Sequence, residues 1–398
     1  MLFDALSSRR PAIAGVFQTA QTKLVTSRQD ELWWQCARGA CEDAGIQLGD
    51  IDGLIGAGPE GAGIRHLLPG AALGFDLLGK PLRFHAASSV GASASAAGVN
   101  LASYAVATGL ADAVLIVNAV AGESPISESS SRDAAVARMA KLSGPYEYID
   151  GTTRASDYAV LARRHMHEFG TKAEQLAAVA VAQRYGATLH PLSVNGSRGE
   201  LTIDEVMESR MIADPLRLLD CCAINQGGGA VVVTTAENAR AARKPAIGYI
   251  GYGEGHSHID PNASPSLCEF PAAKVAADTA FRIAGVSRDQ IDVAGISDHF
   301  TVNVLFGLES AGFCGVGEGG HMAESGALRI GGSLPTNTAG GFLSFSHAGL
   351  CGIFTLVELV EQLRGEGGHR QVSGAKYGYL NGVGGAMQNN FSAILGEV

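Results

Sequence analysis

An internal repeat constrains the fold of this chain more than any other feature. The segment AGIQLGDIDGLIG begins at Ala44, and the similar segment AGVSRDQIDVAGIS begins 240 residues later, at Ala284. Each copy has the pattern of a helix end, a short turn and a strand. A helix rich in glycine and other small residues follows in each half, over 88–109 and 340–365, and a strand with a Gly pair follows at 377–386. Because repeated units pack together to bury a shared face, we expect two similar halves whose small-residue helices meet at the centre.

The first turns of these two helices, near residues 90 and 347, are expected to converge on one pocket. Backbone N–H groups at a helix start have no partner within the helix, and the helix dipole favours negative charge there. A ligand that carries or develops negative charge would therefore find donors in this pocket.

Strands and helices alternate along most of the chain, which predicts the α/β class. The apolar run over 112–122 is typical of a strand that is covered on both faces. Composition becomes more charged over 123–214, where three helices are predicted near 154–169, 172–184 and 203–210. The predicted organisation is a first half over 1–122 plus 215–240, a loop domain over 123–214, and a second half over 241–398.

Composition excludes several classes of protein. Hydrophobic residues make up 46% of the chain and charged residues 17%, which is too apolar for a disordered chain. A net charge of −10 gives no overall attraction for nucleic acid or an anionic membrane surface. The seven cysteines form no CxxC pair, and the sequence shows neither a secretory signal pattern nor a long apolar run. We therefore expect a cytoplasmic protein without a structural metal.

Two segments carry candidate catalytic residues. His347 lies in TNTAGGFLSFSHAGLCG, a glycine-rich loop that enters a helix, where an imidazole can act as a general base or an oxyanion donor. Ser297 and His299 belong to SDHF, at the end of the repeated strand, where α/β proteins place their ligands. Each could instead be a surface residue or a strand cap. Cys351 lies about one helical turn after His347, although a buried, unreactive thiol is the commoner situation.

At these residues the chain resembles the thiolase superfamily, and above all the sterol-carrier-protein-x type thiolases and the thiolase-like lipid-transfer proteins of bacteria. The resemblance covers nearly the whole chain and is carried by DYAVLARRHMHEFGTKAEQLAAVAVAQRYGA, SRMIADPLRLLDCC, LESAGFCGVGEGG, LPTNTAGGFLS and NGVGGA. It implies an α/β thiolase fold with two βαβαβαββ halves in five αβαβα layers and an inserted loop domain. It also implies a homodimer that acts on a coenzyme A thioester and needs no cofactor.

The chain departs from the family at the residues that carry thiolysis. The family's nucleophilic cysteine would stand at Ala92, or at Gly91 if the register shifts by one, and no cysteine lies between Cys41 and Cys221. Asn381 occupies the position assigned to the second cysteine, and Ser297 replaces the Asn or His of the family's NEAF or HDCF motif. The histidine of the family's GHP motif is retained as His347.

Without the cysteine, the scaffold can still stabilise an enolate, which needs only proton transfer and oxyanion donors. The resemblance therefore favours aldol or retro-aldol cleavage of a 3-hydroxyacyl-CoA, as in the thiolase-like aldolases of steroid side-chain breakdown. Those aldolases work with a partner of the OB-fold, zinc-ribbon type and use tyrosines in the segments that correspond to SDHF and FSHAG, where this chain has Ser297 and the stretch 345–347 without a tyrosine. His347, Ser297 and His299 would form the acid–base set, and the backbone at two glycine-containing pairs, Gly91–Ala92 and Gly384–Gly385, would bind the acyl group. Two alternatives remain open: a C-acyltransferase with an atypical nucleophile such as Cys351, and a non-catalytic acyl-CoA-binding subunit of a larger complex.

Overall fold

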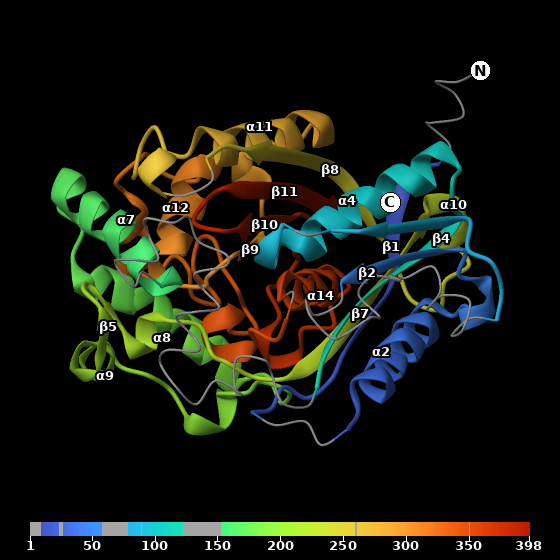
Figure 1. Cartoon of the computed structure of the whole chain (residues 1–398), viewed down its shortest axis with the longest axis horizontal. Helices are drawn as coiled ribbons and strands as arrows, with labels where there is room; N and C mark the ends of the chain where they lie inside the picture. Colours follow the sequence, from blue (N-terminus) through green and yellow to red (C-terminus); the bar gives the residue numbers. More distant parts are fainter. Residues whose placement is uncertain are drawn as a thin grey trace.

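The computed structural model describes residues 9–23, 27–57, 79–88, 90–121, 153–258, 261–349 and 351–398. Within these ranges nine strands form one sheet in the order β3-β2-β4-β7-β1-β8-β11-β10-β9 (Figure 1). The first half contributes β1 (Pro11–Gln18), β2 (Gly53–Ala57), β3 (Phe84–Ala87), β4 (Ala113–Val120) and β7 (Gly227–Thr235). The second half contributes β8 (Ile247–His256), β9 (Val293–Ile296), β10 (Gly378–Gly384) and β11 (Asn389–Gly396). β5 (Met211–Ala213) and β6 (Leu216–Arg217) form a separate hairpin.

The strand order confirms that the two halves repeat one another. In the first half β2 pairs in parallel with β4, and β7 then runs antiparallel between β4 and β1. In the second half β9 pairs in parallel with β10, and β11 runs antiparallel between β10 and β8. The counterpart of β3 is reduced to one parallel bridge between Ala294 and Thr336. The halves join where β1 and β8 pair over two residues each, so the repeat seen in the sequence is a repeat of topology.

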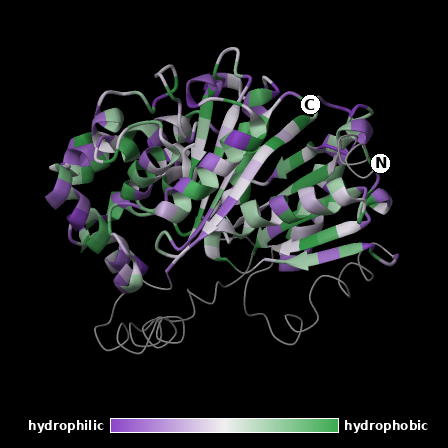
Figure 2. Ribbon diagram, turned by 90° about the horizontal axis from the view of Figure 1, so that it is seen from above, coloured by the Kyte–Doolittle hydropathy of each residue, from purple (hydrophilic) through white to green (hydrophobic). Residues whose placement is uncertain are grey.

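Two helices form the central layer between the strands of the first half and those of the second. α4 (Ala94–Thr108) contacts β4 and β2 of its own half and β10 of the other, and α14 (Gly352–Leu363) contacts β10 and β9 as well as β1, β7 and α4. The outer layers are α2 (Gln29–Ala44) on the first half and α11 (Pro271–Ala284) with α12 (Thr301–Ala311) on the second. This arrangement confirms the thiolase-type α/β fold. In Figure 2 hydrophobic residues follow the strands and the helix faces that cover them.

The remaining described helices are α7 (Arg154–Phe169), α8 (Ala173–Thr188), α9 (Ile203–Glu208), α10 (Ala236–Ala239) and α13 (Gly319–Glu324). α8 packs against α12 and α13 of the second half. Part of the predicted loop domain, 123–152, lies outside the described residues, so the proposed domain boundaries stay a prediction. No helix in the described part of the chain is long and apolar enough to span a membrane.

The segment 340–365 is not one continuous helix, contrary to the sequence prediction. It consists of η8 (Gly341–Phe345), a single wide turn, then an irregular loop that carries His347, and then α14. Gly340 and Gly341 take φ values of 109° and 57°, and Gly349 takes 57°. These left-handed conformations break the helix, because only glycine adopts them without strain. The break is what places His347 beside the end of β9.

Candidate active site

The end of β9 is fixed by hydrogen bonds from two neighbouring segments. The Asn337 side chain pairs with both backbone groups of Ile296, with N–O distances of 2.8 Å on either side. The Ser297 hydroxyl donates to the carbonyl of Asn381 at 3.1 Å and accepts the N–H of Val383 at 3.0 Å. Ser297 therefore ties β9 to β10. Its assignment to the acid–base set stays a prediction, and its hydroxyl already serves the backbone.

Asp298 holds the turn that leads to His347. Its buried carboxyl accepts the N–H of Phe342 at 2.8 Å and the N–H of Leu343 at 3.0 Å. Burial raises the pKa of Asp298 to about 7, against the lowering effect of these two hydrogen bonds. A Cβ on Gly341 would lie 2.3 Å from a carboxyl oxygen of Asp298, so glycine is needed at this position for contact as well as for conformation.

His347 is anchored through its backbone, which leaves the imidazole available. Its N–H donates to the Asn225 Oδ1 at 2.7 Å, and the Asn225 Nδ2 donates to the Ser346 hydroxyl at 3.0 Å. Ser346 in turn donates to the Gln21 side chain at 2.8 Å. Asn225 lies 122 residues before His347 in the chain. Sequence reasoning missed it, because no local pattern connects the two segments.

His299 and His347 face one another across the site. Their ring centroids are 5.3 Å apart with a nearly perpendicular, edge-to-face arrangement, and Phe342 packs edge-on against both rings. Both ring nitrogens of His299 and the Nε2 of His347 lack a hydrogen-bond partner among the described residues. Burial lowers the pKa of His347 to about 4, and burial together with the neighbouring imidazole lowers that of His299 further. Both rings are therefore uncharged at neutral pH and keep a lone pair for proton transfer.

Cys351 completes a three-residue cluster with the histidines. Its thiol and one ring nitrogen of each histidine all lie within 4.8 Å of one another. Cys351 is fully buried at the first turn of α14, whereas the two histidines are partly exposed. Burial and the nearby Cys222 and Asp298 raise the pKa of the Cys351 thiol well above its usual value. In the protein alone, Cys351 is a thiol and not a thiolate.

The two predicted acyl-binding loops lie against each other. Gly91, at the start of η3 (Gly91–Ser93), has φ +64°, and a Cβ there would lie 3.3 Å from the Gly385 nitrogen. A Cβ on Gly384 would lie 1.8 Å from the carbonyl oxygen of Val90, so this close approach requires glycine. The starts of α4 and α14 also lie close together. A Cβ on Gly352 would lie 3.4 Å from the Ala92 carbonyl oxygen. Their role in binding an acyl group stays a prediction.

Asn381, which occupies the position that the resemblance assigns to the second family cysteine, does not face the start of α4. A Cβ on Gly307 of α12 would lie 3.5 Å from the Asn381 Oδ1, so this side chain points to the outer helix layer. Strand alternation turns the next residue inward. A Cβ on Gly382 would lie 3.6 Å from the Ser93 Cβ. Gly382 and Gly384 are therefore residues of β10 that face the α4 start, and neither has a side chain to supply.

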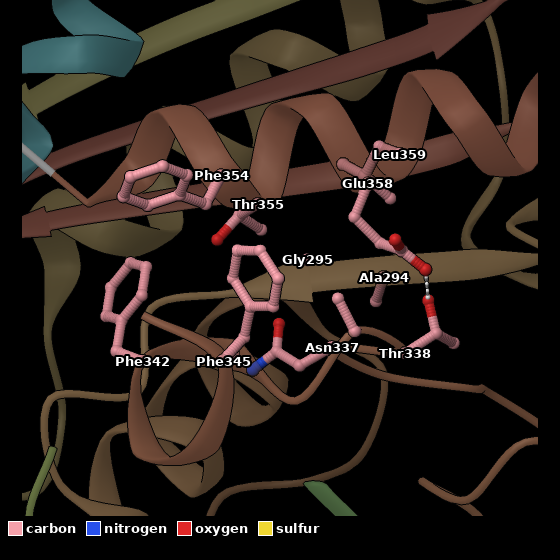
Figure 3. Close-up of a pocket in the computed structure, with 12 residues that line it drawn as sticks. Ala294, Gly295, Asn337, Thr338, Phe342, Phe345, Phe354, Thr355, Glu358 and Leu359 are labelled. Carbon is pink, nitrogen blue, oxygen red and sulfur yellow. Dashed lines mark hydrogen bonds between the residues drawn. The ribbon is translucent and has the colours of Figure 1, made fainter. Parts of the chain in front are cut away.

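A small internal cavity lies behind the His347 loop (Figure 3). Phe342 and Phe345 of η8, Phe354 and Thr355 of α14, and Asn337 contribute to its lining. Its volume of about 10 Å³ is room for about one water molecule. The Thr355 hydroxyl points toward the gap between the phenylalanines and has no partner among the described residues. This cavity is too small for a substrate.

Tyr158 of α7 is a further residue that sequence reasoning missed. Its hydroxyl donates to the Gly385 carbonyl at 2.8 Å, and its ring packs on Phe300 at 4.9 Å. Burial raises the pKa of Tyr158 to about 12, so the hydroxyl stays protonated. Tyr158 thereby fixes one of the glycine loops from the side of α7.

Comparison with known proteins identifies the family. Residues 253–397 match the family model described as "Thiolase C-terminal domain-like". The chain is 34% identical to an acetyl-CoA acetyltransferase of Methanothermobacter thermautotrophicus over 383 residues, which cover 95% of this chain and 97% of the relative. The chain belongs to the thiolase superfamily. It is also 31% identical to a steroid side-chain-cleaving aldolase of Thermomonospora curvata, with 88% of this chain and 90% of that protein covered.

Among solved structures, this thiolase-superfamily chain is similar to an aldolase complex. The structure described as "Ltp2-ChsH2(DUF35) aldolase" superposes with a TM-score of 0.85 at 28% identity and covers 98% of both chains. The relatives thus include both acyltransferases and aldolases. Membership alone does not choose between these reactions, and the choice has to come from the site.

Proposed function

We propose that this thiolase-superfamily protein cleaves a carbon–carbon bond in an acyl-CoA thioester by a non-covalent retro-aldol reaction on a 3-hydroxyacyl-CoA. The observation that carries the proposal is the pair of uncharged imidazoles, His299 and His347, which pack edge to face at the end of β9 and have ring nitrogens without a hydrogen-bond partner in the described part of the chain. At the start of α4 stand Gly91 and Ala92, which supply no nucleophile. The similarity to a steroid side-chain-cleaving aldolase supports the same reaction class.

The chemistry assigns a separate task to each group. His347 takes the proton from the 3-hydroxyl, the C2–C3 bond breaks, and C3 leaves as the carbonyl of an aldehyde or ketone. The electron pair of that bond passes into the thioester enolate, which backbone N–H groups of the Gly91–Ala92 and Gly384–Gly385 loops stabilise. Protonation at C2 then gives the shortened acyl-CoA. His299 is placed to position the 3-oxygen or to return the proton.

One observation favours a second candidate, a C-acyltransferase that uses Cys351. The thiol lies within 4.8 Å of both imidazole nitrogens, as a nucleophile and its base would. Against it stand the complete burial of Cys351 and the raised pKa of its thiol. The retro-aldol reaction needs no thiolate and is therefore the better fit to this site.

The proposal extends to partners and location. We propose a cytoplasmic homodimer that acts together with an OB-fold, zinc-ribbon protein and needs no cofactor. The similarity to an aldolase complex that contains a DUF35 component supports the partner.

The test is a product assay with the purified protein, with and without such a partner, on panels of 3-hydroxyacyl-CoA and 3-ketoacyl-CoA. Retro-aldol cleavage releases an aldehyde or ketone without free CoA, whereas thiolysis consumes free CoA. His347→Ala is expected to lower kcat about 100-fold or more. The matched control is His321→Ala, because the His321 side chain is 74% exposed on α13.

Three results would contradict the proposal. Turnover that requires free CoA would favour the acyltransferase. Acyl-CoA binding without turnover, even with the partner present, would indicate a non-catalytic binding subunit. Unchanged turnover in His347→Ala would remove the assigned base.

A further inference from the structure

The His299–His347–Cys351 cluster has the composition of a soft-metal site. Two imidazole nitrogens and a thiol sulfur lie within 4.8 Å of one another. These are the donor types that Zn²⁺ prefers, and tetrahedral zinc sites in proteins are commonly built from cysteine and histidine. The three residues come from two segments that the packing of β9 against the His347 loop brings together.

Ring nitrogens of this cluster lack hydrogen-bond partners among the described residues, which sets the cluster apart from the other candidate group. In that group His190 receives the N–H of Leu192, and Glu358 and Glu361 both pair with Arg370. Its lone pairs are already used. In the active-site cluster, by contrast, the buried ring nitrogens of His299 and the His347 Nε2 have no partner in the described part of the chain. Such orphaned polar atoms in a folded protein are a sign of an ion or water that belongs there.

We propose that His299, His347 and Cys351 bind one Zn²⁺ ion and that zinc bound there inhibits the enzyme. Each histidine offers a lone pair, and the Cys351 thiol releases its proton as the Zn–S bond forms.

Cys222 lies beside the cluster, where its backbone N–H donates to the His299 carbonyl at 2.9 Å. A water molecule is available as the fourth ligand of a tetrahedral ion.

Inhibition is expected because zinc and the substrate proton would bind the same lone pair on His347. The proposed reaction needs the free nitrogen of His347 to accept the substrate proton, and a bound metal occupies that nitrogen. Zinc and turnover are then mutually exclusive. This consequence rests on the proposed function, whereas zinc binding itself does not.

The binding experiment uses the full-length protein stripped with EDTA and titrated with Zn²⁺ against a chromophoric chelator. We expect one ion per chain, and in the Co²⁺-substituted protein an absorption band from thiolate-to-cobalt charge transfer. Cys351→Ser and His299→Ala should each weaken binding about tenfold or more and remove or reduce that band. Cys268→Ser is the matched control, because this buried cysteine lies outside the cluster and should bind zinc as the wild type does. Thermal melting of every variant confirms that each is folded.

The inhibition experiment follows cleavage of 3-hydroxyacyl-CoA as zinc is added and then removed with EDTA. The zinc concentration for half inhibition should match the measured Kd, and Cys351→Ser should need about tenfold more zinc relative to its own zinc-free rate. Wild type that binds no stoichiometric zinc, or variants that bind it equally well, would overturn the site. Full turnover at saturating zinc would overturn the inhibition. A protein without lyase activity would still give a decisive binding result, so the two proposals fail separately.

Discussion

Replacement of Gly341 by alanine tests how the His347 loop is held. Gly341 has φ +57°, and an alanine Cβ there would lie 2.3 Å from one Asp298 carboxyl oxygen. The left-handed conformation alone costs an alanine about 1–2 kcal/mol. The clash would also displace Asp298 from the N–H groups of Phe342 and Leu343. Hydrogen bonds to a charged group contribute about 1.5–3 kcal/mol each, so we expect a total loss of about 4–8 kcal/mol in the free energy of unfolding.

The matched control is Gly170→Ala, at the end of α7. Gly170 has φ +72°, and a Cβ there meets nothing within 4 Å, so this variant should lose only about 1–2 kcal/mol. Urea unfolding at pH 8, where the Asp298 carboxyl is charged, measures both losses, and the slopes should stay equal to that of the wild type. Retro-aldol turnover should fall only in Gly341→Ala, because only this change moves His347. Equal losses of stability in the two variants would refute the role assigned to Asp298.

Three further predictions follow from buried groups. Thr355→Val should raise the free energy of unfolding by about 1 kcal/mol, because it removes a buried hydroxyl without a described partner; a lower melting temperature would show that the hydroxyl is bonded to water. Burial lowers the pKa of His190 to about 4, so the contribution of His190 to stability should be complete above pH 6.5 and fall by up to about 3 kcal/mol toward pH 4. His190→Gln should flatten this pH dependence, and an unchanged slope would count against it. Tyr158→Phe should lose about 1 kcal/mol and some acyl-CoA affinity, measured by calorimetry, because the Gly385 carbonyl loses its donor.

The sequence by itself determined the architecture. The repeat at Ala44 and Ala284 predicted two similar halves, and the strand order of each half confirms it. The small-residue helices were predicted to meet at the centre, and α4 contacts α14 and strands of both halves. The patterns that predict each helix and strand are local, because hydrophobic periodicity and the glycines that end helices involve residues close together in the sequence. The sequence likewise shows that no cysteine stands at Ala92, the position that the resemblance assigns to the family's nucleophile.

Only the tertiary structure decided how the site is assembled. His299 and His347 lie on different segments, and their contact depends on the turn that Asp298 and Gly341 hold between them. The sequence prediction of one helix over 340–365 failed at this turn, because left-handed glycines interrupt the apolar pattern without changing its period. The support of His347 by Asn225 and the inward position of Gly382 are also set by packing between distant segments. Hydrogen bonds between segments far apart in the chain leave no periodic signal, so a single sequence does not reveal them.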